Sequence, residues 1–269
     1  MSYEGESLIL LQNELHTQQN QISELSKQVA DLQELILKQS KKNLMFDDLV
    51  KVLSKEIRKS IENDRKNLEY QMTRLSSMET ARYIMKNMEK VKSFSCIEDL
   101  WTFAIEQVSI EGMYLEFGVY LGRSINFLSN IKKQVEFYGF DSFEGLPEDW
   151  RTGYHKGTFE CDLPKVNVNV TLIKGYFEDT LHEFVLKHED NCAFIHVDCD
   201  LYSSAKTIFN CLKNQIKSGT IILFDEYFNY PDWQNGEFKA FQEFVLENQI
   251  QYDYLAYQNT HEQVIVKIL

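Results

Sequence analysis

The sequence predicts an α/β protein in which an N-terminal α-helical coiled coil precedes a parallel sheet built from strand and helix units. Near the N-terminus, apolar residues recur at alternating steps of three and four, which is typical of helices that pair along a seam. From residue 113 onward, short apolar runs alternate with helix-like stretches, which indicates a parallel sheet. The last two runs are separated only by a short polar turn, so we expect them to form an antiparallel hairpin at one edge of the sheet.

The predicted coiled coil follows a heptad register. Its a positions are Leu8, Leu15, Ile22, Val29 and Ile36, its d positions are Leu11, Leu25 and Leu32 with Gln18 and Gln39 as polar interruptions, and the register continues through Asn43, Phe46, Val50, Leu53 and Ile57. β-Branched residues at a with leucine at d favour a parallel dimer, and a lone asparagine at a helps to fix the register. The alternative is one amphipathic helix lying on its own domain.

Three segments follow from this pattern. Residues 1–65 are predicted to be a coiled-coil oligomerisation segment, with a homodimer favoured. No glycine or proline interrupts the helical register, since neither occurs from Glu6 to Ile110. Residues 66–110, where the apolar spacing is less regular, are predicted to be a helical connector that packs on the next domain. Residues 111–269 are predicted to be the functional domain.

The strands of that domain are expected in seven apolar runs. They are "MYLEFGV" at 113–119, "VEFYGF" at 135–140, "VTLIKG" at 170–175, "AFIHVD" at 193–198, "TIILFD" at 220–225, "YDYLAYQ" at 252–258 and "EQVIVKIL" at 262–269.

Composition excludes several functions. The net charge is −13 and the basic residues are scattered, which argues against nucleic-acid binding. No apolar run is long enough to cross a bilayer, and the N-terminus lacks the basic flank and long apolar stretch of a secretory signal, so we expect a cytoplasmic protein. The five cysteines are never spaced as C-x-x-C, so we expect free thiols without a zinc site or disulfide frame.

The segment "YLEFGVYLGRS" is predicted to run from a strand through a tight turn into a helix. Gly118 and Gly122 would let the backbone approach a ligand there, although the G-x-G-x-x-G dinucleotide pattern is absent. Asp141 ends the next strand about twenty residues further on, where a carboxylate can accept hydrogen bonds from a ribose diol. Tyr176 and Phe177, after Gly175, are candidates to hold an adenine ring, with core packing as the alternative.

From Arg82 to the C-terminus, the chain resembles the macrocin O-methyltransferase group of class I S-adenosylmethionine-dependent methyltransferases. The likeness lies in "LEFGVYLGRS", "FYGFDSFEGLPEDW", "KGYFEDTL", "IHVDCDLYSS" and "IILFDEY", in this order. It implies a Rossmann-like, seven-stranded doubly wound sheet that binds the cofactor at the carboxyl ends of its strands. The implied cofactor-binding residues are Glu116, Phe117 and Gly118 at the methionine end, Asp141 at the ribose, Ser142 with the cover segment 143–157, and Gly175 and Phe177 at the adenine. Val119, Ser124 and Tyr176 are further cofactor-binding candidates.

Acidic residues follow two neighbouring buried strands. Asp198 comes after "FIHV", and Asp225 with Glu226 after "TIILF". Like charges gathered in one crevice need a cation or protons, and oxygen ligands suit Mg²⁺, so these three are predicted to bind a divalent metal. The alternative for each acid is a helix cap, which we favour for Asp200. Glu226 stands where the family more often has aspartate, so the side chain at this position is longer than in most of the family.

Transfer of a methyl group to a hydroxyl requires a base to remove its proton. Asp198, His196 and His261 are the candidate bases, and a buried strand histidine such as His196 is alternatively a core residue. Trp233 and Tyr230, in an aromatic loop after the second acidic strand, are candidates to stack on a sugar, with packing of the loop as the alternative.

These observations favour a Mg²⁺- and S-adenosylmethionine-dependent O-methyltransferase acting on a vicinal diol, with a sugar of a glycan or glycosylated metabolite as the expected acceptor. A catechol presents the same pair of oxygens. The alternative is a coiled-coil assembly protein with a non-catalytic, cofactor-binding domain. A nicotinamide-dependent dehydrogenase fits less well, because paired acids have no role in hydride transfer.

Overall fold

The computed structural model describes residues 3–39 and 44–269. The chain separates into two compact units, Met1–Gln71 and Met72–Leu269. In the described ranges, no helix combines the length and apolarity that a bilayer span requires.

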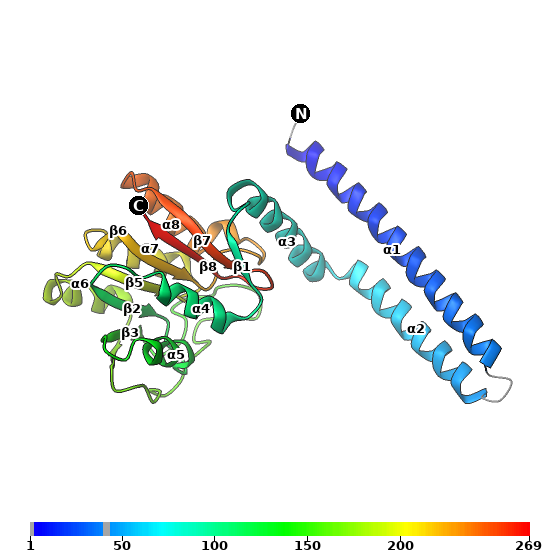
Figure 1. Ribbon diagram of the computed structural model, residues 1–269, viewed down its shortest axis with the longest axis horizontal. Coiled ribbons are helices and arrows are strands. Elements are labelled where there is room, and N and C mark those ends of the chain that lie inside the picture. Colours follow the sequence, from blue (N-terminus) through cyan, green and yellow to red (C-terminus); the bar gives the residue numbers. More distant parts are fainter. Residues whose placement is uncertain (1–2, 40–43) are drawn as a thin grey trace. The chain divides into compact units, whose positions relative to one another are not determined.

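The first unit contains α1 (Tyr3–Gln39) and α2 (Leu44–Lys66), which lie side by side and antiparallel (Figure 1). The continuous seam predicted from residue 8 to residue 57 is therefore wrong, because the chain reverses between the two helices. Asn43 lies outside the described residues, as do the side chains of Leu8, Leu11, Gln39 and Phe46. No glycine or proline marks this reversal in the sequence, which is why the heptad pattern runs through it without a break.

The second unit is built on one sheet of eight strands in the order β1-β7-β8-β6-β5-β2-β3-β4. The strands are β1 (Lys92–Phe94), β2 (Met113–Phe117), β3 (Phe137–Asp141), β4 (Val170–Lys174), β5 (Cys192–Val197), β6 (Ile216–Phe224), β7 (Tyr252–Gln258) and β8 (Val264–Ile268). Strands β2 to β6 pair in parallel, and β8 pairs antiparallel with both β6 and β7. The predicted α/β class, the seven apolar runs and the C-terminal hairpin are confirmed.

The expected number of seven strands is wrong, because β1 adds an eighth. It pairs in parallel with β7 and so lies outside the hairpin, within the segment predicted to be a helical connector. The strand is three residues long and mostly exposed, so it has none of the apolar alternation by which strands are recognised.

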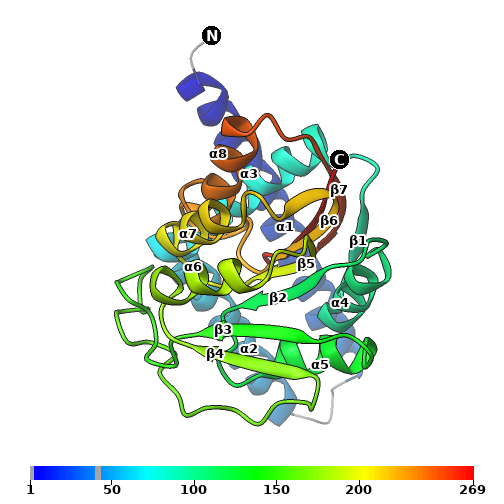
Figure 2. The ribbon, with the colours of Figure 1, turned by 90° about the vertical axis from the view of Figure 1, so that its left-hand side faces the viewer.

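Helices cover both faces of the sheet. They are α3 (Leu68–Asn87), α4 (Ile97–Glu106), α5 (Arg123–Ile131), α6 (Phe177–Lys187), α7 (Tyr202–Leu212), the short 3₁₀ helix η1 (Trp233–Asn235) and α8 (Glu237–Glu247). Figure 2 shows α4 and α5 on one face, and α6, α7 and α8 on the other.

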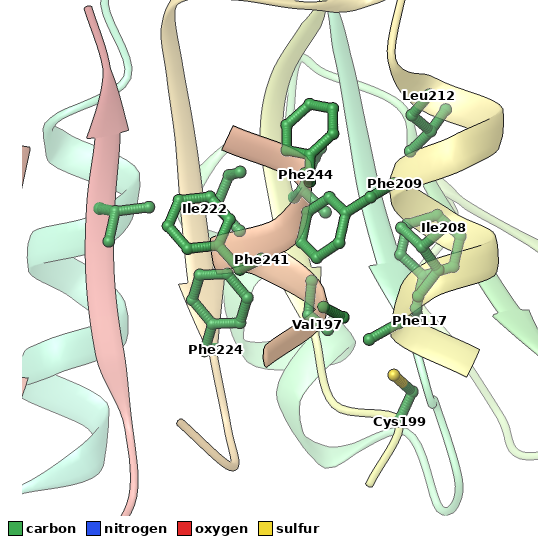
Figure 3. Packing of buried hydrophobic residues seen from close by; sticks show 14 of the residues in the cluster. Phe117, Val197, Cys199, Ile208, Phe209, Leu212, Ile222, Phe224, Phe241 and Phe244 are labelled. Carbon is green, nitrogen blue, oxygen red and sulfur yellow. The ribbon is translucent and has the colours of Figure 1, made fainter. Parts of the chain in front are cut away.

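Alternate residues of the strands form two hydrophobic cores, because successive side chains point to opposite faces. Phe117, Val197 and Phe224 pack against Phe209 of α7 and Phe241 of α8 (Figure 3). On the other face, Tyr114, Phe194 and Leu223 belong to the core of α4 and α5. The buried strands thus have a fixed register, which determines where their carboxyl ends meet.

The strand order reverses between β2 and β5. From β2 the chain proceeds outward to β3 and β4, then returns to place β5 on the other side of β2. In open α/β sheets, ligands bind at the carboxyl ends of the strands beside such a reversal. The loops after β2 and β5 touch there, since a Cβ on Gly118 would lie 1.6 Å from the carbonyl oxygen of Asp198. Only glycine fits this turn, where φ is +96°.

Candidate active site

A cavity of about 280 Å³ lies at this reversal. It is lined by Gly118, Tyr120, Asp141, Ser142, Gly145, Leu146, Pro147, Phe159, Tyr176, Phe177, Glu178, Asp198, Cys199, Asp200, Ser204, Asp225 and Glu226. Residues from five parallel strands, β2 to β6, or from their following loops therefore meet at one place, as the sequence predicts for a ligand crevice.

Asp141 organises the glycine turn from the end of β3. Its Oδ2 accepts hydrogen bonds from the backbone N–H groups of Val119 at 2.9 Å and Tyr120 at 2.8 Å. Its Oδ1 accepts a third from Phe143 at 2.7 Å. The carboxylate thus fixes two loops at the cavity wall, and its remaining lone pairs are the groups that a ribose hydroxyl would meet.

The other residues of the predicted methionine end divide between wall and core. Gly118 lines the cavity, whereas Phe117 and Val119 are buried in the two cores. Glu116 is fully buried: Oε1 accepts a hydrogen bond from Ser124 Oγ at 2.8 Å, and Oε2 lies 3.0 Å from His196 Nδ1. Glu116 and Ser124 therefore lie behind the wall.

The predicted adenine end and cover are present in the cavity wall. Tyr176 and Phe177 line it directly after Gly175, although Phe177 also packs edge-on against Phe117. Ser142 donates from Oγ to the carbonyl of Gly145 and accepts from the N–H of Glu144. The cover segment is tied across itself by backbone hydrogen bonds between Leu146 and Thr158 and between Gly157 and Leu146.

The acidic end of the cavity holds Asp198, Asp225 and Glu226. Burial, reinforced by the Asp225 carboxylate, raises the pKa of Asp198 well above its ordinary value, and burial does the same to the pKa of Glu226. Gln263 of the C-terminal hairpin donates from Nε2 to Asp225 Oδ1 at 2.9 Å. Raised pKa values in one crevice mean that the charged forms require a balancing cation.

Asp200 lines the same cavity, although the sequence favoured a capping role for it. Helix α7 begins at Tyr202 with Leu201 as its N-cap, so Asp200 precedes the cap. Its backbone has φ of +62°, which is uncommon for a residue with a side chain. Burial raises the pKa of Asp200 to about 7 against the opposing charge of Arg151. Such a strained conformation is a property of the folded loop and has no signal in the sequence.

Glu237, the first residue of α8, was not among the residues predicted from the sequence. It is fully buried, its Oε1 accepts a hydrogen bond from the N–H of Cys199 at 3.0 Å, and its Oε2 lies 3.4 Å from the N–H of Glu226. Burial raises the pKa of Glu237 to about 8. An acid in the first turn of a helix is ordinarily read as a favourable helix-dipole contact, which hides this role.

The donors at the acidic end fit a divalent metal. One ring nitrogen of His196 and one carboxylate oxygen each from Asp198 and Asp225 all lie within 4.8 Å of one another. Two buried polar atoms, His196 Nε2 and Glu226 Oε2, have no hydrogen-bond partner within the part of the chain that the structure describes. Glu226 lines the cavity but does not belong to the compact group of three donors.

Three further candidates lie away from the cavity wall. His261 is exposed, and its Nδ1 lies 3.4 Å from Gln263 Nε2, which connects it to Asp225 only indirectly. Trp233 and Tyr230, expected to stack on a sugar, are 2% and 4% exposed. Trp233 packs edge-on against Tyr83 and Phe238, so the packing alternative is the correct one.

Arg151 of the cover segment partly offsets, by its charge, the rise that burial causes in the pKa of Asp200, and no pattern in the sequence singles it out. Its guanidinium lies 3.9 Å from the ring centre of Trp150 and pairs with Glu262 at 3.4 Å.

Comparison with known proteins agrees with this architecture. Residues 115–227 match a family model described as a methyltransferase domain. No curated protein matches the chain. Among solved structures, the calicheamicin methyltransferase CalS11 aligns with a TM-score of 0.54 and 18% identity over 63% of this chain and 77% of that one. The O-methyltransferase NovP aligns with a TM-score of 0.51 and 18% identity over 63% and 78%.

These likenesses establish the fold. The family match runs from residue 115, within β2, to residue 227, after β6, and this range contains every residue of the cavity wall. The predicted enzyme class is confirmed by this match. Residues 115–227 therefore match a methyltransferase domain, and the chain shares the fold of CalS11 and NovP.

Proposed function

We propose that the protein is a divalent-metal- and S-adenosylmethionine-dependent O-methyltransferase of the macrocin type, which methylates one hydroxyl of a vicinal diol on a sugar. The observation that carries the proposal is a single cavity lined by two chemically different groups of residues. One group comprises the glycine turn, Asp141 and the aromatic pair Tyr176 and Phe177, and the other comprises Asp198 and Asp225. A nucleoside cofactor suits the first group, and a cation with two acceptor oxygens suits the second.

The chain's own residues have distinct tasks in this proposal. When bound, S-adenosylmethionine supplies the methyl group, and the cation lowers the pKa of the acceptor hydroxyl. Asp198 and Asp225 hold the cation, with Gln263 fixing the orientation of Asp225. Glu226 lines the cavity with one carboxylate oxygen that lacks a partner among the described residues, so its longer side chain can contact the cation through water. The cover segment excludes water from the reacting atoms.

For the proton acceptor we propose Asp200. Among the candidates from the sequence, His261 does not line the cavity, and Asp198 serves as a ligand of the cation. Asp200 does line it, from a loop held in a strained conformation beside Asp198. Strain of this kind is frequent where a functional side chain must be aimed at a ligand. Asp200→Asn should therefore lower kcat by about 10²-fold or more while leaving metal affinity within about threefold.

The sugar acceptor rests on chemistry and on one comparison. A vicinal diol offers two adjacent oxygens to one cation, which both a sugar and a catechol can provide. CalS11, which shares the fold, is a TDP-rhamnose 3′-O-methyltransferase. TDP-rhamnose is accordingly a suitable first acceptor to test, with catechol as the contrasting compound.

For assembly, we propose a homodimer through the N-terminal hairpin of α1 and α2. Leu15, Leu25, Leu32, Leu53 and Ile57 are each about half exposed, at 46–58%. These residues belong to the predicted seam, and leucines repeated along a helix usually face an apolar partner. A second copy of the chain presents the same apolar surface, so pairing of the two copies would cover the exposed leucines of each. The cytoplasmic location remains a prediction from the sequence.

Two successive measurements test the function. Calorimetry should show binding of S-adenosylmethionine, and mass spectrometry should then show the gain of one methyl group on a sugar nucleotide, dependent on Mg²⁺ and abolished by EDTA. Absence of cofactor binding would contradict the enzyme, and cofactor binding without methylation of any acceptor would favour the non-catalytic, cofactor-binding scaffold. Methylation of catechol with none on any sugar would contradict the acceptor class only.

A further inference from the structure

His196 is buried in a way that requires an explanation. Its side chain is 0% exposed in the middle of the sheet, and Nδ1 lies 3.0 Å from Glu116 Oε2. The other ring nitrogen, Nε2, has no hydrogen-bond partner in residues 3–39 or 44–269. Leaving a buried polar atom unpaired costs about 1–3 kcal/mol. Such an atom in a native protein usually has a partner that the protein chain alone does not include.

The location of the ring indicates what that partner is. His196 and Asp198 are two residues apart at the end of β5, so their side chains leave the same face of the sheet. A ring nitrogen of His196 and one oxygen each of Asp198 and Asp225 lie within 4.8 Å of one another. Donors that bind one ion at about 2.0–2.3 Å are separated by no more than this.

The contacts of Glu116 fix which nitrogen is available. A carboxylate can only accept, so Nδ1 carries the proton that is donated to Glu116, and Nε2 keeps its lone pair. Ser124 donates to the other carboxylate oxygen of Glu116 and holds it in place. Histidines that bind metals generally donate their second N–H to a carboxylate or carbonyl in this manner.

We propose that His196 is a nitrogen ligand of the cation held by Asp198 and Asp225, with Glu116 as the carboxylate that orients it. This inference rests on the metal site of the proposed function and assigns it a mixed nitrogen and oxygen donor set. Imidazole favours transition metals over Mg²⁺. The site therefore prefers Mn²⁺ or Co²⁺ to Mg²⁺ more strongly than a site made of carboxylates alone.

The same geometry argues against His196 as the general base. The residue does not belong to the cavity wall, whereas Asp198, Asp200 and Asp225 do. A base must reach the proton that it removes. A ligand, by contrast, can approach the cation from behind the wall.

Pulsed electron paramagnetic resonance of bound Mn²⁺ tests the proposal without a substrate. Full-length wild-type protein should show coupling of Mn²⁺ to an imidazole nitrogen, and the coupling should change when the protein is produced with isotopically labelled histidine. His196→Gln should abolish it. The matched control, His261→Gln, alters the other candidate histidine of this region and should retain it.

Metal titration gives a second readout. His196→Gln should lower the affinity for Co²⁺ by at least about tenfold and that for Mg²⁺ by less than about threefold. Glu116→Gln should have a smaller effect in the same direction. If His196→Gln does not fold, labelled wild type together with His261→Gln still decides the assignment.

The outcomes separate this inference from the proposed function. Mn²⁺ that binds, is lost in Asp198→Asn, and shows no histidine coupling would overturn the role of His196 and leave the carboxylate site standing. Mn²⁺ that fails to bind, or binds equally well to Asp198→Asn, would overturn the metal site itself and this inference with it.

Discussion

Glu237 accepts a hydrogen bond on Oε1 from the backbone N–H of Cys199 at 3.0 Å. Its second oxygen lies 3.4 Å from the N–H of Glu226, so one buried side chain joins the loops that follow β5 and β6. Those loops carry Asp198 and Asp225. Glu237 therefore connects the start of α8 to the spacing of the proposed metal ligands.

Glu237→Ala should lower the free energy of unfolding by about 1–3 kcal/mol, because it leaves two buried N–H groups without an acceptor. It should also weaken Mg²⁺ binding by about tenfold, since it removes a group that positions the ligand loops. Chemical denaturation and calorimetry measure the two effects. Glu243→Ala, on the same helix, removes a partly exposed carboxylate paired with Lys206 and should cost less than about 1 kcal/mol. Equal effects of the two variants would contradict this role.

Asp141→Ala should weaken binding of S-adenosylmethionine, because three backbone N–H groups at the cavity wall lose their acceptor. We expect a loss of at least about tenfold, the equivalent of one charge-assisted hydrogen bond. Calorimetry on protein whose fold is verified by circular dichroism measures the change. Asp190→Ala, at an exposed position after α6, is the control. Unchanged affinity in Asp141→Ala would place the cofactor elsewhere.

Much of the sheet was predictable, because buried parallel strands are short apolar runs whose ends carry polar residues. Asp198 and Asp225 were identified in this way, and both line the cavity. The pairing of Glu116 with His196 could not be predicted from the sequence. It depends on the register of β2 against β5, where these two residues lie opposite each other. Neighbouring strands in space are far apart in the chain, and apolar patterning does not reveal their alignment.

Two other features had no local signal. The left-handed backbone of Asp200 results from the packing of its loop, and aspartate before a helix ordinarily indicates a cap. The reversal between α1 and α2 lacks the glycine or proline that marks most turns, and a heptad register is compatible with one long helix or two short ones.

Stability at alkaline pH should depend on a buried group of tyrosines. Tyr83 and Tyr227 each hydrogen-bond through their hydroxyls to Tyr254, at 2.5 and 2.7 Å. Burial raises the pKa of Tyr83 to about 12, above the ordinary value of 10.0. The neutral phenol is therefore favoured in the folded state, and its stabilisation is complete below pH 10 and lost as the pH rises toward 12.

The stability of the Tyr83→Phe variant should be less sensitive to the rise in pH from 10 to 12. Its free energy of unfolding, measured by denaturation in urea, should be lower than that of the wild type near neutral pH, since a hydrogen bond is removed. It should then fall less steeply between pH 10 and 12. Identical slopes for the two proteins in that range would show that Tyr83 does not contribute.

Charges introduced on the exposed leucines of the hairpin should disrupt assembly. Leu25→Glu with Leu32→Glu places two carboxylates on the apolar surface proposed to meet a second copy, so the particle mass by light scattering should fall. Ser23→Glu, an exposed position on the opposite side of α1 from Leu25 and Leu32, is the matched control and should leave the mass unchanged. A mass that is the same for the double variant and the wild type would exclude the hairpin as the assembly surface.

One cavity is proposed to bind a methyl donor at one end and a cation at the other, and paired calorimetry of Asp198→Asn and Asp225→Asn tests this most directly. Asparagine keeps the size of the side chain and removes its charge, so the two variants isolate the electrostatic role of the pair. We predict that both lose Mg²⁺ binding, by about 10²-fold or more, and bind S-adenosylmethionine within about threefold of the wild type. Relief of like-charge repulsion should also raise their melting temperature in EDTA. Unchanged Mg²⁺ binding in both folded variants would contradict the proposal.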